Sequence, residues 1–142
     1  WNKKRIPTIK EWELAAYTEF RPNNKDGYKF KKSYPYPTGE NTLGLNCLND
    51  CNFNYPSKYS KFLLRGYGHV STFSTKKGIN GLYDMGGNVW EWVDINDNSY
   101  KGTKGGSWWY GKNQMIQGYN ATKPKNMSAV YIGFRCVKDF EN

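Results

Sequence analysis

Residues 78–92, with the sequence GINGLYDMGGNVWEW, constrain the fold more than any other part of the chain. This stretch places Asp84 and Glu91 on either side of a glycine pair, at the start of a tryptophan-rich run. Because glycines disfavour the interior of a helix, the sequence predicts a tight loop that enters a short strand over residues 89–93. Such a loop can turn backbone carbonyls inward while the two carboxylates close a ring. Several oxygens, some of them charged, are the ligands that calcium requires.

Glu91 is flanked by tryptophans in a stretch that carries apolar groups on both faces, as a buried strand does. An unpaired carboxylate is costly to bury, so Glu91 needs either a cation or an arginine or lysine partner. The sequence leaves both alternatives open, and we favour calcium.

The N-terminal segment predicts one helix within residues 1–20. Thr8 is suited to cap the start of this helix, and Glu11, three residues later, is suited to complete a capping box. Trp12, Ala15 and Ala16 then fall at positions i, i+3 and i+4 on one apolar face, and we expect Trp12 to pack in the core.

The C-terminal part of the sequence predicts two further strands. The aromatic run at residues 108–110 follows Ser107 and a glycine pair that allows a close approach of the backbone, and it predicts a strand. Residues 129–137 carry the strongest strand pattern in the chain. The intervening residues 111–128 are polar and predict a long loop.

Four segments occur in the order typical of the formylglycine-generating enzyme (sulfatase-modifying factor) family, which the chain resembles. They are RIPTIKEWELAA at residues 5–16, GLYDMGGNVWEW at 81–92, KGGSWW at 104–109 and IGFRCV at 132–137. The resemblance implies a single α+β domain over residues 1–142. Its fold would be C-type-lectin-like and loop-rich, with short antiparallel strands and one or two helices. Because family members usually carry further elements before the first segment, we expect the N-terminal part of the family fold to be missing here.

The resemblance also implies which residues would hold calcium. The first site maps onto residues 78–92, at Asp84, Gly87, Val89 and Glu91. A second site would use Asn46 and Cys47 together with a later acid-glycine-aromatic triplet. Residues 65–67 read Arg-Gly-Tyr at that place. Because a guanidinium cannot ligate a cation, we expect the second site to be weakened or lost.

Catalysis in this family depends on groups that the sequence lacks. The formylglycine-generating enzyme oxidises a cysteine with copper held by two cysteines, whose positions match Tyr110 and Met115 here. Cys136 matches a different family cysteine, and the usual partner position of that cysteine is Ala16. Iron-dependent branches use several histidines, whereas this chain has one, His69. The sequence therefore predicts neither copper binding nor a catalytic centre.

We therefore expect a calcium-stabilised binding or structural module. The alternative is a divergent enzyme of the same family, completed by residues outside this sequence. Aromatic groups beside adaptable polar groups make good recognition surfaces. The resemblance places such a surface where family members hold substrate, at Ser107, Trp108, Trp109, Tyr110, Gln114 and Tyr119. A protein, a peptide, a glycan or another subunit of a larger complex would bind there.

Charge and hydropathy narrow the class of partner. The net charge is +9, from 21 Lys and Arg against 12 Asp and Glu. The lysines are scattered in pairs without a helical stripe, which disfavours nucleic acid as a partner. No apolar run reaches the roughly 20 residues that a membrane span needs.

The two nearby cysteines, Cys47 and Cys51, leave three alternatives open. They form a local disulfide, remain free thiols, or contribute to a zinc site, for which Cys136 and His69 are the remaining candidate ligands. A disulfide together with calcium use would fit an extracytoplasmic location, which we expect.

Overall fold

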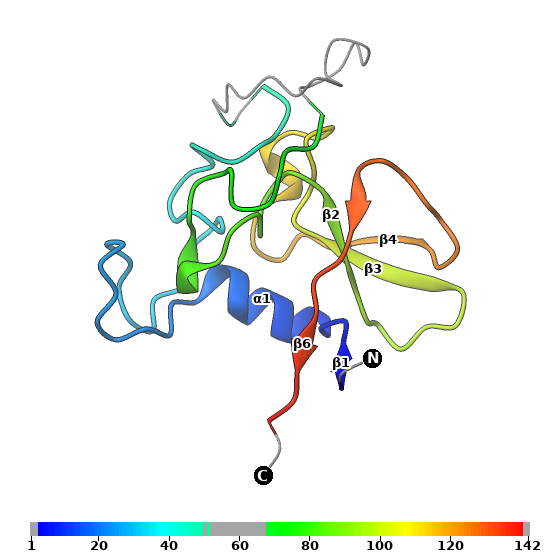
Figure 1. The fold of residues 1–142 in the computed structure, drawn as a ribbon, viewed down its shortest axis with the longest axis horizontal. Helices are drawn as coiled ribbons and strands as arrows, with labels where there is room; N and C mark the ends of the chain where they lie inside the picture. Colours follow the sequence, from blue (N-terminus) through cyan, green and yellow to red (C-terminus); the bar gives the residue numbers. More distant parts are fainter. Residues whose placement is uncertain (1–2, 50, 52–67, 141–142) are drawn as a thin grey trace.

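The structure of the protein, a computed structural model, describes residues 3–49, 51 and 68–140. Within these ranges the fold is α+β and loop-rich, as expected (Figure 1). The elements in chain order are β1 (Lys4–Arg5), α1 (Ile9–Tyr17), η2 (Ile79–Gly81), β2 (Trp90–Val93), β3 (Tyr100–Lys104), η3 (Lys112–Gln114), β4 (Ala121–Pro124), β5 (Ile132–Gly133) and β6 (Val137–Lys138).

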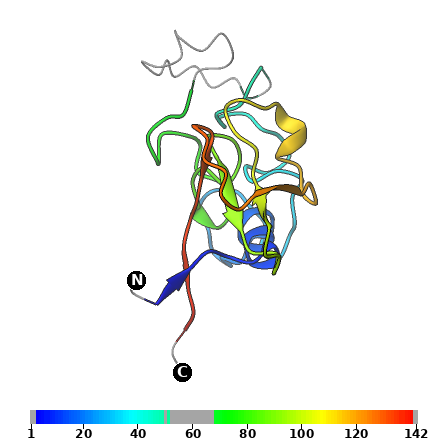
Figure 2. The same cartoon turned by 90° about the vertical axis from the view of Figure 1, so that its right-hand side faces the viewer.

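The strands form two small sheets. The larger sheet has the order β4-β3-β2-β5, with β3 antiparallel to both of its neighbours. The expected short antiparallel strands are confirmed, except that β5 at the edge of this sheet runs parallel to β2. Strands β1 and β6 pair as a separate antiparallel ribbon, which brings the two ends of the chain together (Figure 2).

The predicted helix is confirmed as α1, with its capping box. The backbone N–H of Glu11 donates to Thr8 Oγ1 at 3.3 Å, and the Thr8 N–H donates back to Glu11 Oε2 at 2.8 Å. Trp12 and Ala16 are buried, as the apolar spacing predicts. At the other end, the side chain of Asn80 donates to the carbonyls of residues 15 and 18 at 2.9 and 2.7 Å. Asn80 therefore satisfies carbonyls that the end of the helix leaves unpaired.

The larger sheet has two different faces. In the ladder Glu91 lies opposite Lys104, and Trp92 lies opposite Thr103. Because side chains alternate along a strand, Glu91 and Lys104 point to one face and Trp92 and Thr103 to the other. We call the first the helix face, since Glu91 is bonded to Trp12 of α1. The second, which also carries Trp90, is the aromatic face.

Lys104 joins three segments on the helix face. Its side chain is 1% exposed, and its Nζ donates to Glu13 Oε1 at 2.7 Å. The same ammonium donates to the carbonyl of Tyr119 and, at 3.1 Å, to Asn120 Oδ1. All three of its donors are therefore satisfied, and a buried charge that would otherwise be costly ties α1 to β3 and to the loop before β4.

Three expectations about strands are corrected. Residues 107–110 form a turn, because Gly105 and Gly106 adopt φ values of 91° and 68° and redirect the chain away from the sheet. Residues 129–137 contain only the short strands β5 and β6, since each pairs with a different neighbour. The polar residues 111–128 are not all loop, because they supply strand β4.

Replacing Glu11 tests the capping box. The pKa of the Glu11 carboxyl is lowered to about 2, because it accepts hydrogen bonds from Arg5 and from the backbone and side chain of Thr8. A lowered folded-state pKa stabilises the fold above the unfolded value of 4.5, and this stabilisation is lost as the pH falls toward 2. We therefore expect Glu11→Gln to lower the free energy of unfolding in urea at pH 7 and to have little effect at pH 2.

The matched control is Glu40→Gln, at an exposed carboxylate whose partner is Lys32. It should change stability less than Glu11→Gln at pH 7. A Glu11→Gln effect of equal size at pH 7 and pH 2 would contradict the assigned role of the carboxylate.

Candidate functional site

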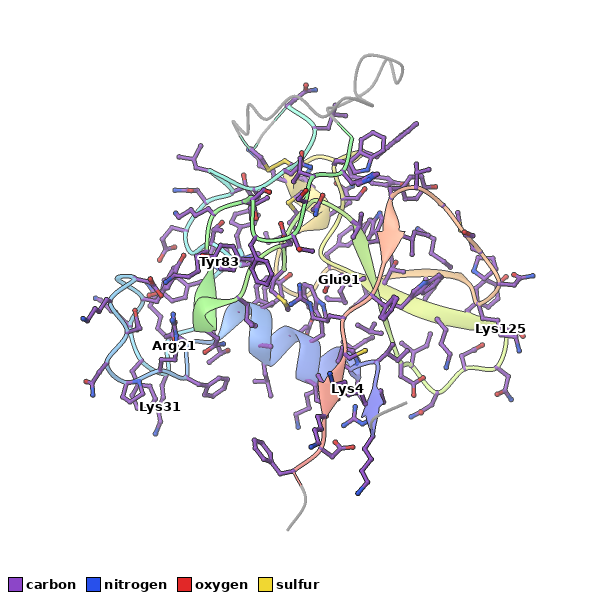
Figure 3. All side chains as sticks on the ribbon, in the orientation of Figure 1. Lys4, Arg21, Lys31, Tyr83, Glu91 and Lys125 are labelled. Carbon is purple, nitrogen blue, oxygen red and sulfur yellow. A yellow bond between two sulfur atoms is a disulfide. The ribbon has the colours of Figure 1, made fainter. Side chains whose placement is uncertain are left out.

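Glu91 forms a buried ion pair in the central region of the molecule. Its side chain is 6% exposed and lies near the middle of the molecule (Figure 3). Arg135, from the C-terminal segment, forms a bidentate pair with it: Nε donates to Oε2 and Nη2 donates to Oε1, both at 2.6 Å. The indole Nε1 of Trp12 donates to Oε2 at 2.6 Å. Of the two partners left open by the sequence, arginine is the one that the structure supplies.

The guanidinium of Arg135 lies among acceptors and negative charges. Burial lowers its pKa, but hydrogen bonding to Glu91 and the charges of Glu91 and Asp84 outweigh burial and raise the pKa overall. Nη2 also donates to the carbonyl of Tyr83 at 3.0 Å. Arg135 therefore stays charged and links β2 to the loop that precedes it.

Asp84 faces the same region from a sharply turned backbone. Its φ is 58°, and Gly87 and Asn88 follow at 72° and 57°, so the predicted tight loop is confirmed. Its Oδ1 accepts from the Thr75 hydroxyl at 2.7 Å, and its Oδ2 accepts from the backbone N–H of Phe73 at 3.1 Å. Both partners are neutral, so the charge of Asp84 is stabilised by hydrogen bonds without being cancelled.

Asn46 has a structural role beside this loop. Its side chain donates to the carbonyl of Gly68 at 2.9 Å, and its own carbonyl accepts from the Asn88 N–H at 2.8 Å. A Cβ added at Gly87 would lie 2.3 Å from that carbonyl, which explains why glycine is required there. Cys47, the second residue expected at the weakened calcium site, lies in a disulfide. The triplet at residues 65–67 lies outside the described residues.

The arrangement only partly fits calcium. Asp84, Val89, Glu91 and Arg135 line one cavity of about 380 Å³. Every oxygen of the two carboxylates already accepts a hydrogen bond from the protein, so an ion would have to share Glu91 with Arg135. In the part of the chain that the structure describes, no group of three or more His, Cys, Asp or Glu residues is placed to hold a metal. Calcium binding therefore stays a prediction.

Packed side chains fill the positions that match the copper-binding cysteines. Met115 is fully buried in a cluster with Leu45 and the two half-cystines. The ring of Tyr110 lies edge-on to Trp90 and to Tyr131, at centroid distances of 5.4 and 6.0 Å. Neither side chain can provide a thiolate.

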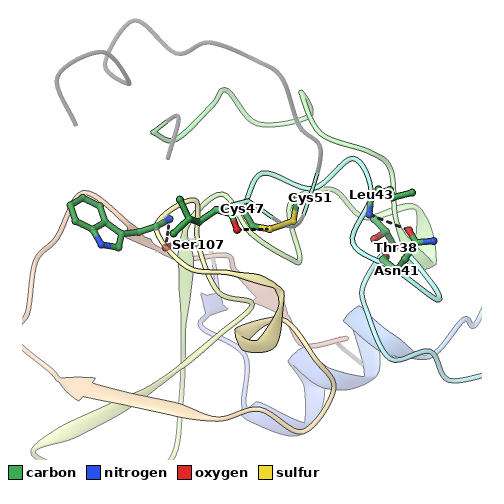
Figure 4. The surroundings of a disulfide bond; sticks show 8 residues. Thr38, Asn41, Leu43, Cys47, Cys51 and Ser107 are labelled. Atoms are coloured by element: carbon green, nitrogen blue, oxygen red, sulfur yellow. Dashed lines mark hydrogen bonds between the residues drawn. A yellow bond between two sulfur atoms is a disulfide. The ribbon is translucent and has the colours of Figure 1, made fainter. Parts of the chain in front are cut away.

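The cysteine pair forms a disulfide with an S–S distance of 2.02 Å (Figure 4). Of the three alternatives left by the sequence, this one is confirmed. Because the bond consumes the thiolates of Cys47 and Cys51, it also removes the zinc site they would have formed. Cys136 is an exposed free thiol.

The six residues expected to contact a ligand are divided between core and surface. Ser107 and Trp108 are fully buried. Trp109, Tyr110 and Gln114 are half-buried, and Tyr119 is 37% exposed.

Several of these residues belong to an aromatic cluster around Trp90, whose further members Trp90, Tyr131 and Lys123 the sequence did not indicate. The ring centroids of Trp109 and Tyr131 are 5.7 Å apart, and those of Tyr119 and Trp90 are 6.2 Å apart. The Nζ of Lys123 lies 5.2 Å from the centroid of Trp90. Alternation along residues 89–93 could have assigned Trp90 to this face, but no local signal marks Tyr131 or Lys123, which reach it through pairing with distant strands.

A family comparison now identifies the class of protein. The pattern described as "Sulfatase-modifying factor enzyme 1-like domain" matches residues 1–140. The chain therefore belongs to this family, as its four segments predict.

Two known proteins are similar in sequence to this chain. The chain is 32% identical to "Inactive C-alpha-formylglycine-generating enzyme 2" of Bos taurus, over 76% of this chain and 33% of the bovine protein. It is 28% identical to "Serine/threonine-protein kinase Pkn1" of Chlamydia trachomatis, over 98% of this chain and 22% of that protein. The chain thus spans about a fifth to a third of these relatives.

Solved structures show the same fold. CarF matches with a TM-score of 0.66 at 23% identity, over 97% of this chain and 48% of that one. PvdO from Pseudomonas aeruginosa matches with a TM-score of 0.63 at 17% identity, over 95% of this chain and 52% of that one. Treponema denticola variable protein 1 matches with a TM-score of 0.58 at 22% identity, over 94% and 46%.

Arg135→Gln tests the buried ion pair. Removing one member of such a pair leaves a buried charge uncompensated, and we expect the free energy of unfolding to fall by about 3 kcal/mol or more. The matched control is Lys32→Gln, at the exposed pair with Glu40, where the loss should be below about 1 kcal/mol. Urea denaturation at pH 7 measures both. Equal losses in the two variants would show that the Glu91–Arg135 pair contributes no more than a surface contact.

Proposed function

We propose that this chain is a non-catalytic member of its family that acts as a binding module. The observation that carries the proposal is the filling of the copper positions by Tyr110 and Met115. Met115 is fully buried against the disulfide, and neither side chain supplies the thiolate that would bind copper(I). The name of the bovine relative, an inactive enzyme, supports the same conclusion.

The aromatic cluster around Trp90 supports a binding role. Half-buried Trp109 and Tyr110 lie beside the partly exposed Tyr119 and the ammonium of Lys123. Such rings supply contact area at little entropic cost, and nearby polar groups supply direction. A protein, peptide or glycan ligand would bind through Tyr119 and Trp109, and Ser107 and Trp108 would support the surface from below.

Calcium is the second element of the proposal. Asp84, Gly87, Val89 and Glu91 would hold the ion, and Glu91 would be shared with Arg135. Because Arg135 already neutralises Glu91, we expect weak binding, on the order of the millimolar dissociation constants of extracellular calcium modules. Such an ion would only add stability, since the arginine satisfies the carboxylate without it.

An extracytoplasmic location follows from the same proposal. The Cys47–Cys51 disulfide would persist in an oxidising compartment, where millimolar calcium is also available. No helix among the described residues has the length and apolar character needed to cross a membrane.

Copper(I) titration tests the absence of the oxidase site. With a colorimetric chelator as competitor, we expect no stoichiometric tight binding and no copper-dependent oxidation of a cysteine-containing peptide. Cys136→Ser is the control for adventitious binding at the exposed thiol. Tight one-to-one binding that survives this substitution would overturn the non-catalytic assignment.

Peptide and glycan arrays test the binding role. We expect Tyr119→Ala and Trp109→Ala to abolish any hit that the native chain gives. Tyr100→Ala removes a similarly exposed ring from the start of β3 and should leave binding unchanged. Absence of any reproducible hit, or equal loss in all three variants, would contradict a binding surface at this cluster.

The dependence of thermal melting on calcium tests the proposed calcium site. At about ten times its dissociation constant, an ion that binds only the folded state stabilises it by about 1.4 kcal/mol. We expect Asp84→Asn to remove this gain. Arg135→Gln should enlarge the gain, because Glu91 would then be free for the ion. Identical melting in calcium and in chelator for the native chain and for Arg135→Gln would exclude the site.

A further inference from the structure

The cavity lined by Asp84, Glu91 and Arg135 shares no residue with the aromatic cluster around Trp90, and it lies between the loop that precedes β2 and the segment that joins β5 to β6. Its volume is about 380 Å³, and residues from both segments line it. The six that matter here are Phe73, Tyr83, Asp84, Glu91, Phe134 and Arg135. Two of these residues, Tyr83 and Glu91, are labelled in Figure 3.

Aromatic rings form the outer walls of this pocket. Phe73 is 73% exposed and Phe134 is 60% exposed, which is unusual for side chains of this size. The ring of Phe73 lies edge-on to Tyr83, with centroids 5.2 Å apart. Exposed rings gathered around a cavity mark a place where a partner covers apolar surface.

The backbone of Phe73 is held in an unfavourable conformation. Its φ is 66°, in the left-handed region that bulky residues rarely adopt. The hydrogen bond from its N–H to Asp84 Oδ2 holds it there, so the exposed ring and the buried carboxylate are positioned together. Strain of this kind is often found at binding sites, which favours a functional reason for the exposed ring.

The inner end of the pocket is negatively charged. Glu91 and Arg135 neutralise each other through two hydrogen bonds of 2.6 Å. Asp84 is 9% exposed, and its hydrogen-bond donors among the described residues are the uncharged Thr75 hydroxyl and the Phe73 backbone N–H. One negative charge therefore remains behind three aromatic rings.

We propose that this pocket binds a lysine side chain of a partner protein. An ammonium group is attracted to the faces of aromatic rings and forms strong hydrogen bonds with a carboxylate. The Nη1 group of Arg135 makes no hydrogen bond to any described residue. It can donate to a backbone carbonyl of the same partner, so the pocket suits a lysine within a peptide better than a free amine.

The test compares three small probes of similar size in the presence of a calcium chelator. They are N-acetyl-lysine methylamide, its neutral analogue N-acetyl-norleucine methylamide, and the acidic N-acetyl-glutamate methylamide. NMR titration of the native chain should show millimolar binding of the lysine probe at the signals of Phe73 and Phe134, and weaker binding of the other two. Equal binding of norleucine, or stronger binding of glutamate, would overturn the proposal.

Variants locate the binding. Phe134→Ala should weaken the lysine probe about threefold to tenfold, because one cation–π contact is lost. Phe30→Ala removes an exposed ring elsewhere, 46% exposed, and should leave the affinity unchanged. Asp84→Asn should abolish the preference for lysine over norleucine, a ratio that a partial loss of stability does not change. Loss of affinity in Phe30→Ala as large as in Phe134→Ala would also contradict the proposal.

This inference does not depend on the aromatic cluster around Trp90, but a lysine and the proposed calcium ion would compete for Asp84, which is why the titrations are made in chelator. Tyr119→Ala should leave lysine binding unchanged, so the two sites can fail separately.

Discussion

The buried pair between Glu91 and Arg135 is the interaction on which the arrangement of the domain depends. Glu91 belongs to the central strand β2, Arg135 to the segment between β5 and β6, and Trp12 to helix α1. Three short hydrogen bonds join these segments, which are far apart in the sequence. Because burying either charge alone would be costly, the helix, the sheet and the C-terminal segment are expected to form together.

The same pair determines what the region around it can do. Once Arg135 neutralises Glu91, the fold no longer requires a metal ion to keep that carboxylate buried. Asp84 remains as a charge without a counter-ion, at the end of a pocket with aromatic walls. Elsewhere in the domain, the packed side chains of Tyr110 and Met115 occupy the positions that match the copper-binding cysteines. The family scaffold is thus retained, and this arrangement supports the proposed binding role.

Local chemistry in the sequence correctly predicted several parts of this structure. The helix followed from Thr8 and Glu11, and the tight loop followed from the glycines around Asp84. The identity of Glu91's partner could not be predicted in this way. Arg135 lies 44 positions from Glu91, and only the parallel pairing of β5 with β2 brings them together. Strand propensity also overestimated the length of the C-terminal strand. Propensity is a local property, and it does not show that β5 and β6 pair with different neighbours.

Hydrogen exchange at Trp12 and Arg135 tests the central claim most directly. If the buried pair holds the domain together, the indole N–H of Trp12 and the Nε–H of Arg135 should exchange only through global unfolding. Their opening free energies, measured by NMR in calcium-free buffer, should then equal that of the most protected core amides. Rapid exchange of either proton while the core amides stay protected would show that the pair opens locally, and would contradict the account.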